Sequence, residues 1–285
     1  MKRVFFCLMV IATSIVGAQL LNAEDKSPVV EIRDENLRKV LLEEKKRRQK
    51  EGDQITQDDL KNLYTFHAEG RSIGDLSGLE HCTNLAEVRL GKNQIRDISP
   101  LGKCVNIQSL SLQENQIEDL TGISGLVKLQ YLNIEKNQVK SLRGMEALVA
   151  MTSLYGSHNQ IDSLEPIIGL KKLWTVSLNH NQIRDIAPLA QLPRLETVGL
   201  AHNQIEDISG LPAGRTTYTT YLQGNKIQDI SHLAALAAGD AQGEKRFAAF
   251  WKLYLAANPL NEESRSKYLE TLKASGVRLN LEYDK

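Results

Sequence analysis

The stretch LAEVRLGKNQIRDISPL at residues 85–101 contains a motif that the rest of the chain repeats. Asparagine stands at its centre, and the same residue recurs at intervals of 22 positions. These asparagines are Asn93, Asn115, Asn137, Asn159, Asn181, Asn203 and Asn225, and Asn258 follows after a longer interval of 33 residues. A fixed period of this size indicates a solenoid, in which each repeat stacks on the one before it.

Apolar residues keep fixed distances from each asparagine. With the asparagine numbered zero, they occupy positions −8, −5, −3, +2 and +5. This spacing is the leucine-rich repeat pattern. Side chains at −5 and −3 should face the core, and those at −6, −4 and −2 should face outward. We therefore predict an α/β solenoid, a horseshoe with a parallel sheet on its concave face and short 3₁₀ turns on its convex face.

The composition argues against several classes of function. The chain has 285 residues, of which 35 are basic and 35 acidic, so its formal net charge is zero. Lysine and arginine do not form a cluster along the repeats, and this argues against a face that binds nucleic acid. The sequence contains no nucleophile elbow, phosphate-binding loop or paired acid–base site. We therefore expect neither an enzyme nor a bound cofactor.

Residues 1–23 have the order of a secretory signal peptide. Lys2 and Arg3 precede an apolar run at residues 4–16, and the small residues Ala18 and Ala23 follow. The run is shorter than the ~20 apolar residues that span a bilayer, so we predict cleavage rather than anchoring. We expect the mature chain to be exported to the periplasm or the exterior, as a monomer without a membrane span.

Residues 24–62 are expected to form a linker and a helical N-terminal cap. A helix with an apolar stripe should cover residues 34–51, with Asp34 as its N-cap. Its second half, EEKKRRQKEG, is charged on every face, so we predict that it is solvated. Thr56 and Asp59 have the spacing of a capping box and begin a second short helix. Such a cap covers the apolar end of the first repeat.

Leucine-rich repeats are predicted for residues 63–260, beginning with a degenerate copy that has Arg71 where asparagine should be. Gly156 replaces an inward leucine, and Thr217 and Thr220 replace two more. Gly156 should leave a gap or pull in a neighbouring side chain, and the core should be weak at Thr217 and Thr220.

Two features end the repeat region. An insertion at about residues 237–249 lengthens the last interval, and because it is rich in Ala and Gly we interpret it as a loop or a short helix. Residues 261–285 should form a C-terminal cap, with a helix over residues 262–274 and a closing strand over residues 277–281.

The repeats of the form NQIxDI resemble those of bacterial internalin-type leucine-rich repeat proteins, and the phosphatase-regulatory proteins of eukaryotes are similar in repeat class. The segments DENLR, ITQDDL and IGDLSGL resemble the helical cap that precedes internalin repeats. The ending NPLNEESRSKYLETLKASGV is similar to the C-terminal cap of exported bacterial repeat proteins. The resemblance implies the fold and a binding role. The chain differs from surface-displayed internalins, because the sequence shows no cell-wall sorting motif and no immunoglobulin-like region after the repeats. The resemblance therefore does not imply adhesion to a host cell.

Two rows of polar residues should be structural. The asparagine side chain can donate to and accept from backbone groups of neighbouring coils. Aspartate recurs at +4, where it can cap the convex turns, at Asp97, Asp119, Asp185, Asp207 and Asp229. A row of carboxylates could also bind calcium, but Ser141 and Ser163 interrupt this one, so we favour capping.

Three histidines occupy position −1 in consecutive repeats: His158, His180 and His202. Their imidazoles should stack along one edge of the concave face. Such a row could hold zinc, but parallel side chains converge poorly on a tetrahedron. We therefore favour a row of exposed turn residues over a metal site.

Cys82 and Cys104 both lie at +11 in adjacent repeats. Residues one coil apart fall within the ~4.4–6.8 Å between Cα atoms that a disulfide requires. The alternative is a pair of buried thiols, because leucine fills this position in the next four repeats. We predict a bond in material folded in an oxidising compartment.

The predicted binding site lies on the outward face of the sheet. Its −4 row is Tyr155, Ser177, Gly199, Tyr221 and Tyr254, flanked by Thr175 and Thr197 at −6 and by Asn179 and Ala201 at −2. With strands about 4.8 Å apart, Tyr155 and Tyr221 should stand roughly 14 Å apart. They would form the walls of a trough with a polar floor.

We expect this trough to recognise a protein or peptide, because tyrosine is enriched at binding hot spots. One alternative is a glycan or cell-wall ligand on the same face, and another is a structural role in the cell envelope. In a third alternative the tyrosines only cover the gap at Gly156 and the weak core at Thr217 and Thr220.

Overall fold

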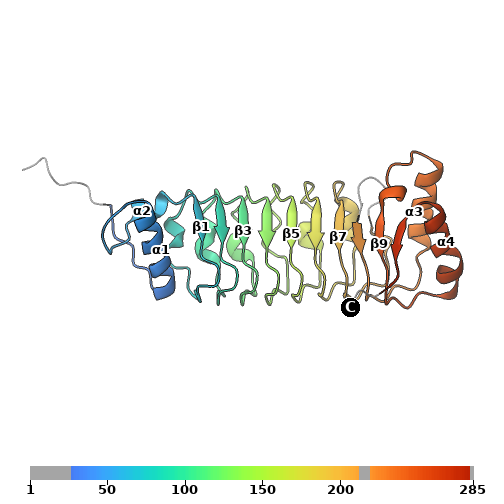
Figure 1. The fold of residues 1–285 in the computed structure, drawn as a ribbon, viewed down its shortest axis with the longest axis horizontal. Helices are drawn as coiled ribbons and strands as arrows, with labels where there is room; N and C mark the ends of the chain where they lie inside the picture. The colour runs from blue at the N-terminus through green and yellow to red at the C-terminus, as the bar shows by residue number, and fades with distance from the viewer. Residues whose placement is uncertain (1–26, 212–218, 283–285) are drawn as a thin grey trace, which may run out of the picture.

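A computed structural model describes residues 27–211 and 219–282. The predicted signal peptide and Thr217 therefore lie outside the described residues. Ten strands form one sheet whose order follows the chain, and every neighbouring pair is parallel (Figure 1). The strands are β1 (Thr65–His67), β2 (Glu87–Arg89), β3 (Ser109–Ser111), β4 (Tyr131–Asn133), β5 (Ser153–Tyr155), β6 (Thr175–Ser177), β7 (Thr197–Gly199), β8 (Thr219–Tyr221), β9 (Lys252–Tyr254) and β10 (Arg278–Asn280). The predicted leucine-rich repeat solenoid is confirmed.

The register of the sheet aligns equivalent repeat positions. Val88 pairs with Leu110, and Leu110 pairs with Leu132, each one period further along the chain. The middle residue of every strand from β1 to β9 is buried, whereas its two neighbours reach the outer face, with the exception of the buried Gly199 in β7. Side chains at one repeat position therefore form a continuous row across the strands.

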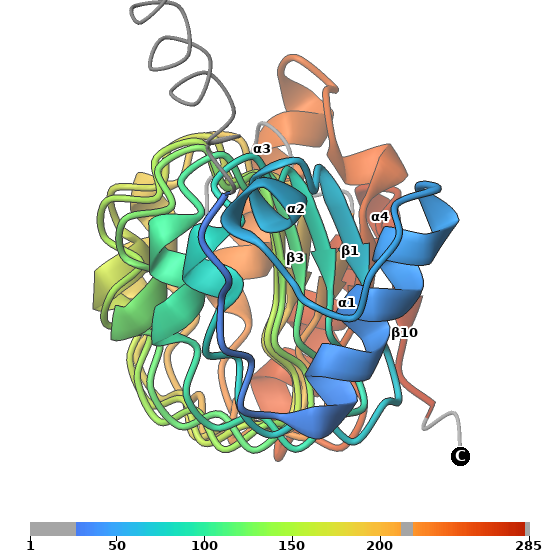
Figure 2. The same cartoon turned by 90° about the vertical axis from the view of Figure 1, so that its left-hand side faces the viewer.

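The convex side consists of short turns. Figure 2 looks along the solenoid and shows the sheet and these turns on opposite sides of the core. The 3₁₀ turns span Leu79–His81, Ser99–Lys103, Thr121–Ile123, Glu165–Ile167 and Ala187–Gln191. Each aspartate at +4 accepts a hydrogen bond from the backbone N–H two residues later. Ser141 and Ser163 accept the same bond through their hydroxyls, so the interruptions of the row preserve its capping role.

The asparagine row joins each coil to the one before it. In Asn181, Nδ2 donates to the carbonyl oxygens of Leu178 in its own coil and Gly156 in the preceding coil, both at 3.0 Å. Its Oδ1 accepts from the N–H of Ile161, also in the preceding coil, at 2.9 Å. The same three bonds recur from Asn93 to Asn258. These are the bonds to backbone groups of neighbouring coils that a structural role requires.

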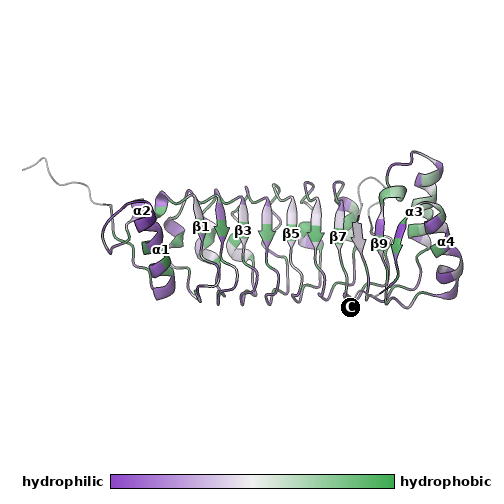
Figure 3. Ribbon diagram, viewed as in Figure 1, coloured by the Kyte–Doolittle hydropathy of each residue, from purple (hydrophilic) through white to green (hydrophobic). Residues whose placement is uncertain are grey.

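Two helices form the N-terminal cap: α1 (Glu35–Arg47) and α2 (Gln57–Lys61). Figure 3 shows α1 as largely hydrophilic, and its apolar stripe is buried against the first coil. Asp34 caps α1 by accepting from the N–H of Leu37. Thr56 and Asp59 form the predicted capping box. Helix α1 ends four residues earlier than the predicted boundary at residue 51.

The prediction that the second half of α1 is solvated is wrong for Lys45. Its side chain is only 9% exposed, and its Nζ lies 3.0 Å from Oδ2 of Asp59. The same Nζ donates to the carbonyl oxygen of Gln54 at 2.7 Å. A buried ammonium group needs such partners, and the return of the chain through α2 supplies them.

The sequence of the insertion at about residues 237–249 favours a loop or a short helix. The first residues of the insertion belong to helix α3 (Ser231–Gln242), and Asp240 closes the following turn by accepting three backbone N–H groups. A π-helical turn at Ser264–Tyr268 then leads into α4 (Leu269–Ala274), and β10 closes the sheet as predicted. Within residues 27–211 and 219–282, no helix combines the length and apolar character that crossing a membrane requires.

The irregular core positions are filled from neighbouring coils. A Cβ on Gly156 would lie 2.9 Å from Leu178 Cδ2, so that leucine has moved into the space which a side chain would occupy. Thr220 is fully buried, and its Oγ1 accepts a hydrogen bond from the indole Nε1 of Trp251 at 2.9 Å. Leu178 and Trp251 thus pack at these two positions.

Candidate binding face

The sheet register brings the predicted site residues together. Tyr155 pairs with Ser177, Ser177 with Gly199, Gly199 with Tyr221, and Tyr221 with Tyr254. Thr175 and Thr197 likewise pair in the −6 row. These seven residues thus form one block on the outer face of β5 to β9.

A pair of tyrosines lies on each side of the predicted trough. The rings of Tyr221 and Tyr254 stack with centroids 4.5 Å apart and an angle of 23° between their planes. On the other side, Tyr155 contacts Tyr131, with centroids 5.4 Å apart and an angle of 42°. Tyr131 was absent from the predicted site because it lies at −6 in the previous repeat. Aromatic side chains can reach diagonal neighbours on adjacent strands, so the diagonal relation between Tyr131 and Tyr155 could have identified Tyr131 from the sequence.

The floor is a hydrogen-bonded network. The hydroxyls of Ser157 and Ser177 lie 3.0 Å apart, and Nδ2 of Asn179 donates to Oγ of Ser177 at 3.4 Å. Oδ1 of Asn179 accepts from the N–H of Ala201 at 2.8 Å. A Cβ on Gly199 would lie 3.1 Å from both amide atoms of Asn179. Asn179 therefore lies across Gly199, and Gly199 and Ala201 are buried rather than exposed as predicted.

On β5 to β8, the outward positions of the sheet hold no formally charged residue, whereas Glu135 and Lys252 hold such positions in the flanking coils of β4 and β9. The −6, −4 and −2 positions from β5 to β8 hold only serine, threonine, tyrosine, glycine, asparagine, alanine and glutamine. Nearer the N-terminus, Oε1 of Glu87 lies 2.7 Å from Nη2 of Arg89 and 3.3 Å from Nε2 of His67. Burial raises the pKa of the Tyr155 and Tyr221 hydroxyls, which keeps both neutral near pH 7. A neutral, aromatic-walled surface thus follows a charged one.

The three histidines form a stack along one edge of the trough. Neighbouring ring centroids are 4.3 Å apart for His158 and His180, and 4.2 Å for His180 and His202, with interplanar angles of 11° and 12°. All three have positive φ angles, from 54° to 59°, like the other residues at −1. Nearly parallel rings direct their nitrogen atoms side by side, not toward one point. In the described part of the chain, no group of three or more metal-ligating side chains is placed to hold a metal ion.

A pocket of about 350 Å³ lies between this stack and the floor. Its lining is Glu135, Lys136, Ser157, His158, Asn179, His180, Ala201, His202 and Gln223. Burial lowers the pKa of His180, and the neighbouring imidazoles of His202 and His158 lower it further. The middle ring is therefore harder to protonate than an imidazole in water.

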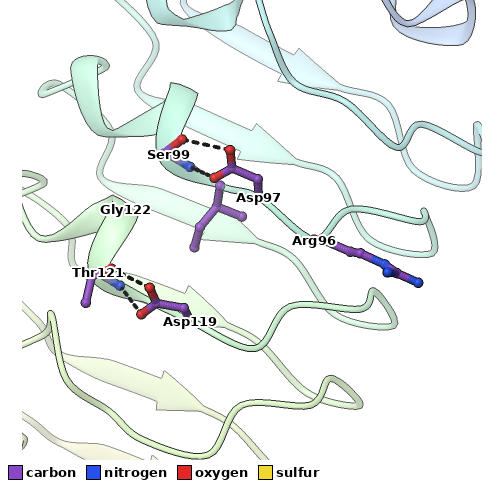
Figure 4. A pocket seen from close by; sticks show the side chains of 7 residues that line it. Arg96, Asp97, Ser99, Asp119, Thr121 and Gly122 are labelled. Atoms are coloured by element: carbon purple, nitrogen blue, oxygen red, sulfur yellow. Dashed lines mark hydrogen bonds between the residues drawn. The ribbon is translucent and has the colours of Figure 1, made fainter.

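A second hollow, of about 370 Å³, lies on the convex side (Figure 4). Its carboxylates are already engaged, because Asp97 accepts from Ser99 and Asp119 accepts from Thr121 through both hydroxyl and N–H. Figure 4 shows Arg96 extending away from both, and its Nε donates to Gln116. This hollow separates two capped turns and presents few unused polar groups.

Cys82 and Cys104 are free, buried thiols in the structure, so the predicted bond is not formed here. Sγ of Cys104 donates to the carbonyl oxygen of Leu79 at 3.1 Å. Burial raises the pKa of both thiols, to about 12 for Cys104. The reduced pair therefore fills two core positions without becoming reactive thiolates.

Thiol titration checks the bond that we predict for material folded in an oxidising compartment. Denatured, unreduced protein lacking residues 1–23 should then show no free thiol, because Cys82 and Cys104 are its only cysteines. A Cys82→Ala chain, which retains a single thiol, provides the reference signal. Two free thiols per chain would show that the reduced pair persists.

Comparisons with known proteins agree with this fold. The family described as leucine-rich repeats (2 copies) matches residues 105–148 and 175–213. No curated protein matches the chain. Internalin C2 of Listeria monocytogenes is 31% identical in sequence with a TM-score of 0.64, and the match covers 71% of this chain and 89% of that one. The internalin InlF of the same organism is 24% identical with a TM-score of 0.64, covering 87% of this chain and 75% of that one.

A leucine-rich repeat protein of Leptospira interrogans has the same fold at 21% identity and a TM-score of 0.50, covering 71% of this chain and 44% of that one. The match to internalin C2 is more informative, because it combines higher identity with nearly the whole length of that protein. The chain belongs to the internalin-type leucine-rich repeat proteins.

Proposed function

We propose that this chain is an exported binding module that recognises a protein or peptide with its concave face. Family membership supports a binding role, since a solenoid presents an extended surface to its partners. The order of residues 1–23 supports export. The observation that carries the proposal is the neutral tract of β5 to β8, with a tyrosine pair at either side.

Tyrosine suits this role because its ring is rigid and has both an apolar body and a polar tip. Tyr155 and Tyr221 are each half-buried, so part of each ring remains available for contact. The tilted contact of Tyr155 with Tyr131 and the stacking of Tyr221 on Tyr254 leave both rings little freedom to lose on binding. Such pre-ordered aromatic side chains concentrate binding energy at protein interfaces.

The proposal is tested by replacing Tyr155 and Tyr221, singly, with alanine. Each change should weaken partner binding by about 1 kcal/mol or more, roughly fivefold in Kd. The partner is first captured from envelope extract by the unaltered chain, and Kd is then measured with the purified partner.

Tyr64→Ala is the matched control, because Tyr64 is 61% exposed and precedes β1, far from the trough. It should leave Kd unchanged. Thermal melts of all variants separate binding from folding. Unchanged affinity in both trough variants, together with lower melting temperatures, would mean that the tyrosines are structural and the binding site lies elsewhere.

A neutral glycan is the second candidate for the same face. The observation that favours it is the combination of tyrosine rings with a floor of hydroxyl and amide groups. Sugars stack on aromatic rings and exchange hydrogen bonds with such groups. Neutral oligosaccharides that displace the captured partner, with the same sensitivity to Tyr155→Ala, would favour the glycan.

A further inference from the structure

We propose that the pocket beside the histidine stack binds an acidic segment of the protein partner, and that it does so most tightly at mildly acidic pH. This inference rests on the proposed function, because it assigns a chemistry to one edge of the same face. The pocket, the stacked rings and an unpaired amide oxygen carry it.

The pocket has a wall of imidazole edges above a polar floor. Ring spacings of 4.2–4.3 Å allow N–H groups of two adjacent histidines to approach the two oxygens of one carboxylate. Ser157 and Asn179 line the floor below them. Ala201 also lines the pocket, and its side chain is only a methyl group, which leaves the space above it open.

Among residues 27–211 and 219–282, the charged groups that face the stack lie at its N-terminal end. Lys136 and Glu135 line the pocket, and Nζ of Lys136 is 3.6 Å from the carboxylate of Glu114. At the other end, the stack meets uncharged Gln223 and Gly224. A Cβ on Gly224 would lie 2.6 Å from Nδ1 of His202, so this glycine makes room for the last ring.

Protonation of the stack is costly when no anion lies beside it. The centroids of neighbouring imidazolium rings would be 4.2–4.3 Å apart, and like charges at this distance repel strongly. This repulsion, added to burial, lowers the pKa of His180. An anion in the pocket would offset the repulsion and favour the protonated rings. By linkage, binding then takes up protons, so affinity rises as the pH falls through the histidine range.

Gln223 indicates that the anion belongs to a peptide. Its Oε1 is buried and has no hydrogen-bond partner in the part of the chain that the structure describes. A buried acceptor without a partner is costly, and a rotation of this side chain toward the pocket that it lines would let a ligand N–H satisfy it. Carboxylate and N–H occur together in a peptide that contains aspartate or glutamate.

The test uses a short blocked oligoglutamate peptide, with oligoglutamine as its neutral counterpart and inorganic sulfate as an anion without N–H groups. Histidine ring protons and the Gln223 side-chain amide are followed by NMR. Oligoglutamate should bind at least about tenfold more tightly at about pH 5.5 than at about pH 7.5. It should also raise the histidine pKa values and shift the Gln223 amide, while oligoglutamine does neither.

Three variants sharpen the test. His180→Asn keeps a residue that tolerates positive φ and should abolish most of the pH dependence. Lys92→Asn is its matched control at the same repeat position, with a φ of 58°, outside the pocket. Glu135→Gln removes the acidic group that faces the ligand and should tighten oligoglutamate binding.

The proposal is overturned if oligoglutamate binds equally at both pH values, or if oligoglutamine binds as well. It is also overturned if sulfate reproduces both the histidine and the Gln223 shifts, because the site would then suit a simple anion. No natural partner is needed for these measurements. Failure of the tyrosine experiment would therefore be seen separately from failure here.

Discussion

Replacing Asn181 with alanine is expected to lower the free energy of unfolding by about 1–3 kcal/mol. The amide side chain is buried and satisfies the carbonyl oxygens of Leu178 and Gly156 and the N–H of Ile161. Alanine would leave these groups of two coils without partners, away from water. Urea unfolding followed by circular dichroism measures the change.

Gln182→Ala is the matched control, because Gln182 is the next residue and its side chain is exposed. Its unfolding free energy should stay within about 0.5 kcal/mol of the unaltered chain. An Asn181→Ala chain that melts like this control would show that the asparagine row does not stabilise the solenoid.

Replacing Asp59 with asparagine is expected to destabilise the N-terminal cap by about 3–5 kcal/mol. Its carboxylate lies 3.0 Å from Lys45 Nζ and 2.9 Å from Lys50 Nζ, and the side chains of Asp59 and Lys45 are 8% and 9% exposed. The change leaves the Lys45 ammonium buried without an anionic partner. Hydrogen exchange should show faster opening of α1 and α2, with β5 to β8 less affected.

Asp58→Asn is the control for this change, because Asp58 is exposed in the same helical turn. The ion pair also predicts a pH dependence. Burial alone would raise the pKa of Asp59, but hydrogen bonds from Lys50, Lys45 and Thr56 outweigh it and hold the pKa well below its usual range. The stabilisation is present above the unfolded pKa of about 3.9 and is lost as the pH falls below it. Equal acid sensitivity of the Asp59→Asn chain and the unaltered chain would contradict this role.

The repeats could be predicted because one local rule recurs with a fixed period. Asn93 and its seven counterparts mark equivalent positions, and the sheet register follows once the period is known. The burial of Lys45 could not be predicted in this way. It depends on a contact with Asp59 that forms only when the chain turns back through α2.

The sequence predicts which residues of the candidate site lie in the same row, but not how their side chains pack against one another. The alternation of strands correctly placed Tyr155 and Tyr221 on the outer face. That Asn179 lies across Gly199 depends on side-chain rotamers and hydrogen bonds between coils, which position in a repeat does not determine. The partnership of Thr220 with Trp251 likewise crosses the insertion, where the period fails.

The asparagine row gives the solenoid a direction of assembly. Because each asparagine satisfies backbone groups of the coil before it, a coil is complete only when the next one has docked. This explains Arg71: before the first coil there is only the helical cap, where Asp34 and Asn36 bond to the backbone of residues 72–75.

At the far end, the N–H of Leu260 bonds to the carbonyl oxygen of Asn258, so the last coil needs no successor. A chain that emerges N-terminus first therefore ends in a coil whose backbone groups still lack the asparagine of the next coil. Each new repeat supplies that asparagine and brings its own unpaired backbone groups, until the C-terminal cap closes the last coil. Loss of whole repeats from the front would remove complete units, whereas a premature stop would expose an open one.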